Sequence, residues 1–421
     1  MHTKSPSPDL IVQSPNILPI PRCDFLGKIL DLSAGLACID KPAKRLQNVR
    51  RKRFLEKIKG SHQIKFIEQV LSHEVGLEFQ KSLTHWLEST LPPNSPILIQ
   101  RDELSRPDES CQHRASVVIN TVGRCRDLEM TLNALSSSWD HSQDELIIVL
   151  GPNDDDSLAV ISKCTLPLRL IRCPVKNLSI SRNLGLSAAL GRYIAFIDDD
   201  ASPEPGWLDA LLSPLQADLQ VAIAAGFVLD GSGQKLLNGY VVADTLGRAQ
   251  SFASHQDALD EIGRIGGHRS FLTATGCNMA FRRDLLSCQG GFDAAFEYFL
   301  EETDAVLRLI HAGFRCQCAP NSLVRHRLSP NIARKPSFKI EQRNTIIRSQ
   351  IHFVRKFGLT TFSAAEIKSI LWSRLLSDLE KIAWDCACDP MPSTDSGRLQ
   401  TAYIQSVTQH LGEVKNHSQV E

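Results

Sequence analysis

The sequence lacks the features that mark a membrane-spanning or secreted chain. Its longest uninterrupted apolar stretch, residues 221–229, is far shorter than the roughly 18 to 20 residues that cross a bilayer as a helix. The N-terminal segment has no apolar core of the kind found in signal peptides. We therefore expect a soluble, cytoplasmic protein.

The chain has no net charge of either sign. Its 47 basic and 47 acidic residues cancel over a length of 421 residues. A balanced chain creates no overall field that would hold a polyanion. Nucleic acid is therefore not an expected partner.

The 12 cysteines lack the dense spacing of a small disulfide-rich domain. The closest pairs are Cys316 with Cys318 and Cys386 with Cys388. Neither pair has the two-residue spacing and the second half-site of a structural zinc module. We therefore expect reduced thiols.

Composition divides the chain into four segments. Residues 1–25 are rich in proline and serine and are predicted to form a mobile tail. Residues 26–112 form a predicted helical extension, residues 113–335 the main domain, and residues 336–421 a second helical extension. In this last segment apolar side chains recur every three or four residues, which predicts an amphipathic helix that packs on the main domain. A membrane-surface or subunit contact is the alternative. The recurring side chains are Ile367, Ile370, Leu371, Leu375, Leu379 and Ile382.

Short β-branched runs alternate with amphipathic stretches in the main domain. This alternation predicts an α/β fold, a mostly parallel sheet covered by helices. Ligands bind such sheets at the carboxyl ends of the strands. The predicted strands span residues 116–120, 146–150, 168–172 and 193–197, and the predicted helices between them span 127–137 and 179–190.

Three consecutive carboxylates, Asp198, Asp199 and Asp200, end the fourth predicted strand. Like charges repel, so this cluster needs a compensating cation or exposure to solvent. Because side chains alternate along a strand, we expect Asp198 and Asp200 to face one side and Asp199 the other. Two carboxylates on one side suit Mg²⁺ or Mn²⁺. A solvated acidic turn is the alternative.

Four separated segments together resemble a family 2 glycosyltransferase. That family is a large group with the GT-A fold and includes many polysaccharide and cell-surface sugar transferases. Any one of the segments alone would be a weak signal. The resemblance spans residues 115–330 and implies a Rossmann-like GT-A domain flanked by the two helical extensions. The segments are residues 115–124, 178–191, 198–207 and 275–313.

The resemblance implies a catalytic base in the acidic stretch that begins at Glu301. Family members present the second carboxylate of an acidic pair to the acceptor hydroxyl, and Glu302 occupies that position. Glutamate replaces the usual aspartate, which changes the reach of the side chain but not its acid-base chemistry. Glu301 is a rival, and Asp304 is a candidate for orienting the site or capping the helix. The alternative is an acidic helix start that interacts with the helix dipole.

The resemblance also implies a metal site. His326 corresponds to a histidine that many family members place on the metal, together with Asp198 and Asp200. We expect Mn²⁺ or Mg²⁺, and the imidazole favours Mn²⁺. A surface or phosphate-contacting histidine is the alternative.

The nucleotide side matches the family less well. Family members commonly carry an aspartate just after the second strand that reads the base, whereas Leu150 and Gly151 stand here. Either Asn153 or Asp154 takes that role through a longer loop, or base recognition differs. The full set of residues that the resemblance places against the nucleotide sugar is Thr121, Arg124, Asn153, Asp154, Arg182, Asn183 and Asp199.

The implied reaction is an inverting transfer from a nucleotide-diphosphate sugar to a hydroxyl of a glycan, a lipid-linked glycan or a small molecule. Glu302 takes the proton of that hydroxyl. The alternative is a catalytically inactive nucleotide-sugar or glycan-binding protein of the same fold. A sugar nucleotidylyltransferase is disfavoured, because residues 121–126 form no glycine-rich loop.

Two further stretches bear on motion and partners. Residues 230–269 carry several glycines and are predicted to form a mobile loop that closes over donor or acceptor. The basic residues of 41–59 form either a solvated helix face or a peripheral contact with anionic lipid. A homo-oligomer also stays open.

Overall fold

The computed structural model describes residues 74–89, 111–139, 142–152, 156–328, 336–388 and 393–413. The predicted tail, the basic stretch 41–59, and Asn153 and Asp154 lie outside the described residues. Among the helices that the structure describes, none has the length and apolar character needed to cross a membrane.

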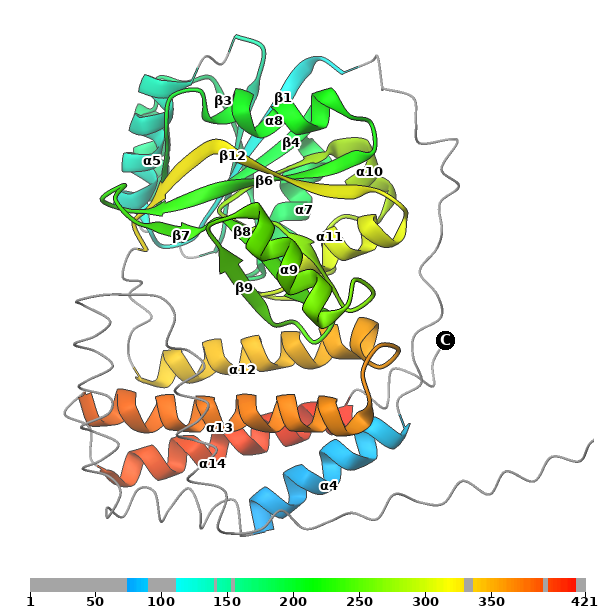
Figure 1. Cartoon of the computed structure of the whole chain (residues 1–421). Helices are drawn as coiled ribbons and strands as arrows, with labels where there is room; N and C mark the ends of the chain where they lie inside the picture. Colours follow the sequence, from blue (N-terminus) through cyan, green and yellow to red (C-terminus); the bar gives the residue numbers. More distant parts are fainter. Residues whose placement is uncertain are drawn as a thin grey trace, which may run out of the picture. The chain divides into compact units, whose positions relative to one another are not determined.

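Four parallel strands form the first half of the main sheet, in the order β3-β2-β1-β4 (Figure 1). All four predicted strands are confirmed, with ends that differ by at most two or three residues. Helices connect them as expected. The strands are β1 (His113–Thr121), β2 (Glu145–Leu150), β3 (Leu168–Arg172) and β4 (Gly191–Asp198), and the helices are α5 (Cys125–Ser138), α6 (Ser157–Lys163) and α7 (Leu178–Ala188).

The second half of the sheet continues from β4 through antiparallel β11 to β6, β12 and β5, and β7 pairs with β6. In this sheet β1, β2, β3, β4, β6 and β12 run in one direction and only β5, β7 and β11 in the other, so the expected mostly parallel sheet is confirmed. The added strands are β5 (Ala201–Pro203), β6 (Val221–Asp230), β7 (Leu236–Asn238), β11 (Asn278–Arg282) and β12 (Arg315–His326), with helices α8 (Trp207–Ala217), α10 (Arg283–Cys288) and α11 (Glu301–His311).

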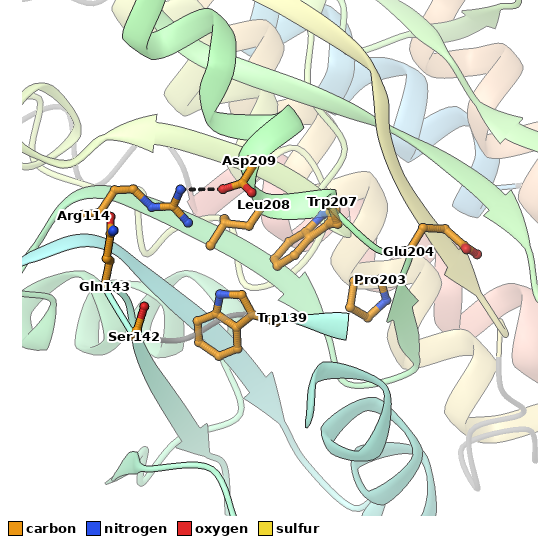
Figure 2. Close-up of a pocket in the computed structure, with 10 residues that line it drawn as sticks. Arg114, Trp139, Ser142, Gln143, Pro203, Glu204, Trp207, Leu208 and Asp209 are labelled. Carbon is orange, nitrogen blue, oxygen red and sulfur yellow. Dashed lines mark hydrogen bonds and ion pairs between the residues drawn. The ribbon is translucent and has the colours of Figure 1, made fainter. Parts of the chain in front are cut away.

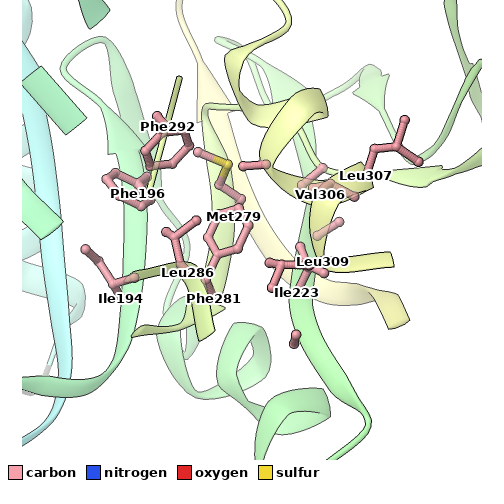
Figure 3. Close-up of a cluster of buried hydrophobic side chains, with 14 of the residues drawn as sticks. Ile194, Phe196, Ile223, Met279, Phe281, Leu286, Phe292, Val306, Leu307 and Leu309 are labelled. Carbon is pink, nitrogen blue, oxygen red and sulfur yellow. The ribbon is translucent and has the colours of Figure 1, made fainter. Parts of the chain in front are cut away.

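Alternation along the strands divides the apolar core into two layers. On β4, Ile194 and Phe196 belong to the cluster covered by α7, α10 and α11, whereas Ala195 and Ile197 belong to the cluster covered by α5 and α8. Figure 3 shows the first cluster, where Phe196 and Phe292 pack near Met279. The two layers hold β4 rigidly in the middle of the sheet, with its acidic end at the carboxyl edge.

The glycine-containing stretch 230–269 is not the open loop predicted from its composition. It forms β7, β8 (Tyr240–Asp244), β9 (Ala249–Phe252) and α9 (His255–Ile265), and β8 and β9 join β10 (Ser270–Thr273) in a second sheet of order β10-β8-β9. Gly233, Gly247 and Gly266 have positive φ. These glycines therefore make tight turns between short elements, which glycine content alone does not reveal.

The C-terminal residues form helices that lie beside α4 (Figure 1). The amphipathic helix predicted around residues 367–382 is confirmed within α13. Its apolar stripe, however, packs mainly against the other helices rather than against the main domain, and Leu246 is the α/β residue buried with it. The helices are α4 (Glu74–Ser89), α12 (Pro336–Phe353), the π-helix η2 (Val354–Gly358), α13 (Ala364–Cys388) and α14 (Ser393–Glu413).

Candidate functional site

The acidic cluster lies at the carboxyl end of β4. The strand ends at Asp198, and Asp199 and Asp200 form the turn into β5. Strand alternation therefore does not extend over all three residues. The Oδ2 of Asp199 accepts a hydrogen bond from Thr121 Oγ1 at 2.7 Å. Thr131 Oγ1 donates to the Asp199 carbonyl at 2.7 Å and fixes the turn.

Arg124 joins two of the three carboxylates. Its Nη2 lies 2.6 Å from Asp199 Oδ1, and its Nη1 lies 3.0 Å from Asp200 Oδ2. Burial raises the pKa of Asp199 to about 7, and the charges of Asp200 and Asp198 add to this, while Arg124 and the Thr121 hydroxyl oppose it. The cluster thus holds three carboxylates, and the Arg124 guanidinium contacts two of them.

His326 meets the acidic cluster from the end of β12. Its Nε2 lies 3.0 Å from Asp200 Oδ1 and 3.9 Å from Asp198 Oδ2. Antiparallel pairing of β12 with β5 sets His326 opposite Ala201 and so fixes this approach. Burial opposes protonation of the imidazole, but the hydrogen bond and charge of Asp200, with the charge of Asp198, raise its pKa above the usual value. The side chains of Asp198, Asp200 and His326 therefore lie close together.

Cys277 is a neighbour of this group that the sequence analysis missed. Its Sγ lies within 4.8 Å of one oxygen of Asp198 and one ring nitrogen of His326. Strand pairing places it there. Asn278 of β11 pairs with Ile197, and this register sets Cys277 beside Asp198. Burial, with the nearby carboxylates, raises the pKa of the thiol well above its usual value. Cys277 is thus a neutral thiol, and with Asp198 and His326 it forms a group that could hold a metal ion.

Arg182 lies away from the acidic turn, in a buried ion pair. Its Nη1 donates to Glu301 Oε1 at 2.6 Å, and both side chains are nearly fully buried. The guanidinium also lies against the rings of Phe196 and Phe292. A Cβ added at Gly276 would lie 2.3 Å from Arg182 Nη2, so glycine is needed for this close approach. The geometry gives Arg182 the task of holding Glu301, whereas the resemblance implied a contact with the nucleotide.

Glu302 stands at the start of α11 with an enclosed carboxyl group. Its Oε2 is buried and has no hydrogen-bond partner among the described residues. Burial raises the pKa of Glu302, and the charge of Glu301 adds to this, while Arg182 opposes it. The chain reaches Glu302 through Phe299 and Leu300, which have φ of 78° and 71°. Two consecutive left-handed non-glycine residues store backbone strain, which is typical of functional sites.

Asp304 and Asn183 have partners within the protein. Asp304 Oδ2 accepts from Arg308 Nε at 2.8 Å, and its Oδ1 lies 2.5 Å from Lys356 Nζ. Asn183 bonds both the N–H and the carbonyl of Phe292, at 2.8 and 2.7 Å. Both residues fix the segments that lead into α11.

Tyr298 is a second site residue that the sequence analysis did not select. Nearly half of the residue is exposed. Burial of its hydroxyl group and the charges of Asp198, Glu301 and Glu302 raise the pKa of the phenol. Its ring therefore stands near both acidic groups. The signal was its position three residues before Glu301.

A cavity of about 320 Å³ lies elsewhere, near the start of β1 (Figure 2). Trp139, Trp207 and Arg114 line it, and Arg114 forms ion pairs with Asp144 and Asp209. None of the predicted site residues lines this cavity.

The profile of glycosyl transferase family 2 matches residues 116–290. The pre-mycofactocin glycosyltransferase of Mycobacterium tuberculosis is 29% identical over 151 residues, which are 36% of this chain and 30% of the relative. The glucosyl-dolichyl phosphate glucuronosyltransferase of Haloferax volcanii is 29% identical over 157 residues, 35% of this chain and 46% of the relative. The chain thus spans less than half the length of these relatives.

Two solved structures are also similar at low identity. The mannosyltransferase PcManGT from Pyrobaculum calidifontis, in complex with GDP-Man and Mn²⁺, has a TM-score of 0.43 and 14% identity, over 85% of this chain and 99% of that one. GalNAc-T7 with UDP, GalNAc and Mn²⁺ has a TM-score of 0.41 and 15% identity, over 68% and 59%. The family match includes β1, Arg182 and the acidic end of β4. Residues 116–290 of this α/β chain therefore form a segment that matches glycosyl transferase family 2.

Proposed function

We propose that this chain is a metal-dependent inverting glycosyltransferase, which moves a sugar from a nucleotide-diphosphate donor to an acceptor hydroxyl. The observation that carries the proposal is that His326 of β12 meets the acidic end of β4, with its Nε2 3.9 Å from Asp198 Oδ2 and 3.0 Å from Asp200 Oδ1. Glu302, with its enclosed carboxyl group, follows on α11. The family 2 match over residues 116–290 supports this assignment.

Asp198, Asp200 and His326 would hold the metal. Two carboxylate oxygens and one imidazole nitrogen suit Mn²⁺, and Mg²⁺ less well. The charges of Asp200 and Asp198 raise the pKa of His326, and a bound cation would offset these charges. When bound, the metal supplies charge neutralisation for the diphosphate leaving group.

Glu302 would act as the base. Its carboxylate takes the proton from the acceptor hydroxyl while that oxygen forms a bond to the anomeric carbon, and the bond between this carbon and the diphosphate oxygen breaks. Attack from the face opposite the leaving group inverts the anomeric configuration. A raised pKa makes Glu302 a stronger base than an exposed glutamate. Glu301 is held by Arg182 and orients the start of α11.

Donor and acceptor would meet between these two acidic groups. Arg124 is partly exposed beside Asp199 and Asp200, so its charge is available to the diphosphate. Thr121 positions Asp199 rather than facing the ligand directly. A lipid-linked glycan is one acceptor class to test, because the name of the Haloferax volcanii relative states a dolichyl phosphate substrate.

The test is a donor screen on the purified chain with Mn²⁺ and with chelator. A donor that binds only the folded state raises its melting temperature. We expect one nucleotide sugar to raise the melting temperature of the chain only when Mn²⁺ is present. The same donor should be hydrolysed or transferred, and NMR should show an inverted anomeric centre in the product. Retention would contradict the inverting mechanism. Binding without any turnover would favour the alternative of an inactive nucleotide-sugar-binding protein.

A further inference from the structure

The C-terminal helices contact the chain on both sides of Glu302. Before it, Ser349 Oγ of α12 donates to the Tyr298 carbonyl at 2.9 Å. After it, Lys356 Nζ of η2 lies 2.5 Å from Asp304 Oδ1. The segment that carries the proposed base is therefore fixed at two points by elements outside the α/β domain.

Lys356 is surrounded by groups that attract a cation. Its Nζ contacts Asp293 Oδ2 at 2.9 Å as well as Asp304, and it lies 5.5 Å from the ring centre of Phe296. His352, one helical turn earlier, lies 3.0 Å from the same Asp293 oxygen. Carboxylates and an aromatic face both attract an ammonium group. Lys356 is partly exposed, but the Asp304 carboxylate that it contacts is fully buried, so solvent screens this ion pair less than one at the surface.

The Asp304 carboxylate depends on this cation. Asp304 is fully buried, and its other oxygen accepts from Arg308 of the same helix. Removal of one partner of a buried ion pair leaves a charge that is incompletely compensated, and the local structure must then shift or take up water. Because Asp304 lies in the first turn of α11, such a shift would move Glu302.

Backbone strain makes this segment sensitive to its supports. Phe299 and Leu300 both have positive φ, and the Asp304 N–H donates to the Leu300 carbonyl at 2.8 Å. A strained conformation persists only where its surroundings over-determine it. Ser349 and Lys356 supply such restraints on either side of the strained pair.

We propose that Lys356, supported by Ser349, is a positioning residue for Glu302, so that the C-terminal helices take part in sugar transfer. This inference rests on the proposed function, because it assigns Lys356 a role only in a reaction that uses Glu302. Lys356 itself touches no reacting atom. It sets the place of α11 through Asp304.

The test compares Lys356→Met with Lys356→Arg and with Lys381→Met. Lys381 is a matched control, since it also approaches a buried aspartate, Asp378, but within the helices and away from α11. We expect Lys356→Met to lower kcat by about tenfold or more, because misplaced catalytic groups are costly. The KM for the donor and the Mn²⁺-dependent thermal shift should stay within about twofold of their wild-type values. Lys356→Arg should restore part of kcat, and Lys381→Met should keep it.

The inference is wrong if the wild type turns over donor and Lys356→Met does so equally well, or loses no more kcat than Lys381→Met. If Lys356→Met fails to fold, Ser349→Ala, which removes one neutral hydrogen bond, must lower kcat with an unchanged donor KM. An unchanged kcat in that variant overturns the inference. An inactive wild type instead refutes the proposed function and this inference with it.

Discussion

At the scale of single residues, the site is defined by unbalanced negative charge. The Arg124 guanidinium contacts Asp199 and Asp200, and the charges of Asp200 and Asp198 raise the pKa of His326. Protein interiors tolerate an excess of negative charge where a cation binds. Charge and geometry therefore both support the proposed metal site.

Replacing His326 by alanine tests the metal site directly. The substitution removes the imidazole donor and leaves both carboxylates, so we expect the apparent affinity for Mn²⁺ to fall by about tenfold or more, as even supporting residues of metal sites typically contribute that much. Thermal shift against Mn²⁺ concentration measures it. His255→Ala, on the exposed start of α9, should leave the titration unchanged. An unchanged titration in His326→Ala would remove His326 from the metal site.

The pH dependence of turnover tests the role of Glu302. A base works in its deprotonated form, and burial with the charge of Glu301 raises the pKa of Glu302 above the ordinary 4.5. We therefore expect kcat to rise with pH through a range higher than an exposed glutamate would give. Turnover at saturating donor, measured across buffers of overlapping pH, reveals this limb. A rate that is already constant from pH 5 upward would contradict the assignment.

At the scale of elements, the site depends on where strands end and how they pair. β4 and β12 bring the acidic turn and His326 to one edge of the sheet, and Cys277, just before β11, lies beside them. Helix α11 brings Glu302 and is tied to α7 by the ion pair of Arg182 with Glu301. The close approach at Gly276 makes this tie possible.

Replacing Gly276 by alanine should therefore disturb the catalytic helix. The new Cβ would lie 2.3 Å from Arg182 Nη2, so the guanidinium that pairs with Glu301 must shift. We expect a loss of about 1 to 3 kcal/mol in the free energy of unfolding, together with lower kcat. Denaturant unfolding and turnover measure the two effects.

Gly263→Ala is the matched control. Nothing lies within 4 Å of a Cβ added at Gly263 in α9. Alanine is also the better helix former, by about 0.5 to 1 kcal/mol. Equal losses in the Gly276 and Gly263 variants would show that the Arg182 contact has no special part in stability.

The strands were predictable from sequence because their signal is local. The apolar runs at residues 116–120 and 193–197 each define a buried strand by themselves. The convergence of Asp198, Asp200 and His326 was reached only through the family resemblance. Other contacts, such as Cys277 with Asp198 or Lys356 with Asp304, join residues far apart in the chain. They follow from strand register and packing, and a local sequence pattern shows neither.

At the scale of the whole described chain, three apolar clusters form the hydrophobic core. Two of them sandwich the main sheet, and the third holds α4, α12, α13 and α14 together. The sequence predicted that the stripe of α13 is apolar, but it could not show which surface covers it. The helices instead pack on one another and contact the α/β domain chiefly through α12 and η2. This arrangement is what lets Ser349 and Lys356 reach the segment around Glu302.

The central claim is that Glu302 is the base of a metal-dependent sugar transfer. The most direct measurement is the turnover of a Mn²⁺-dependent donor by Glu302→Gln beside Glu129→Gln, an exposed glutamate on α5. The amide cannot take the acceptor proton, so we expect Glu302→Gln to bind the donor as the wild type does and to lose about a hundredfold or more in kcat, while Glu129→Gln stays active. A Glu302→Gln variant that transfers sugar at the wild-type rate would contradict the account.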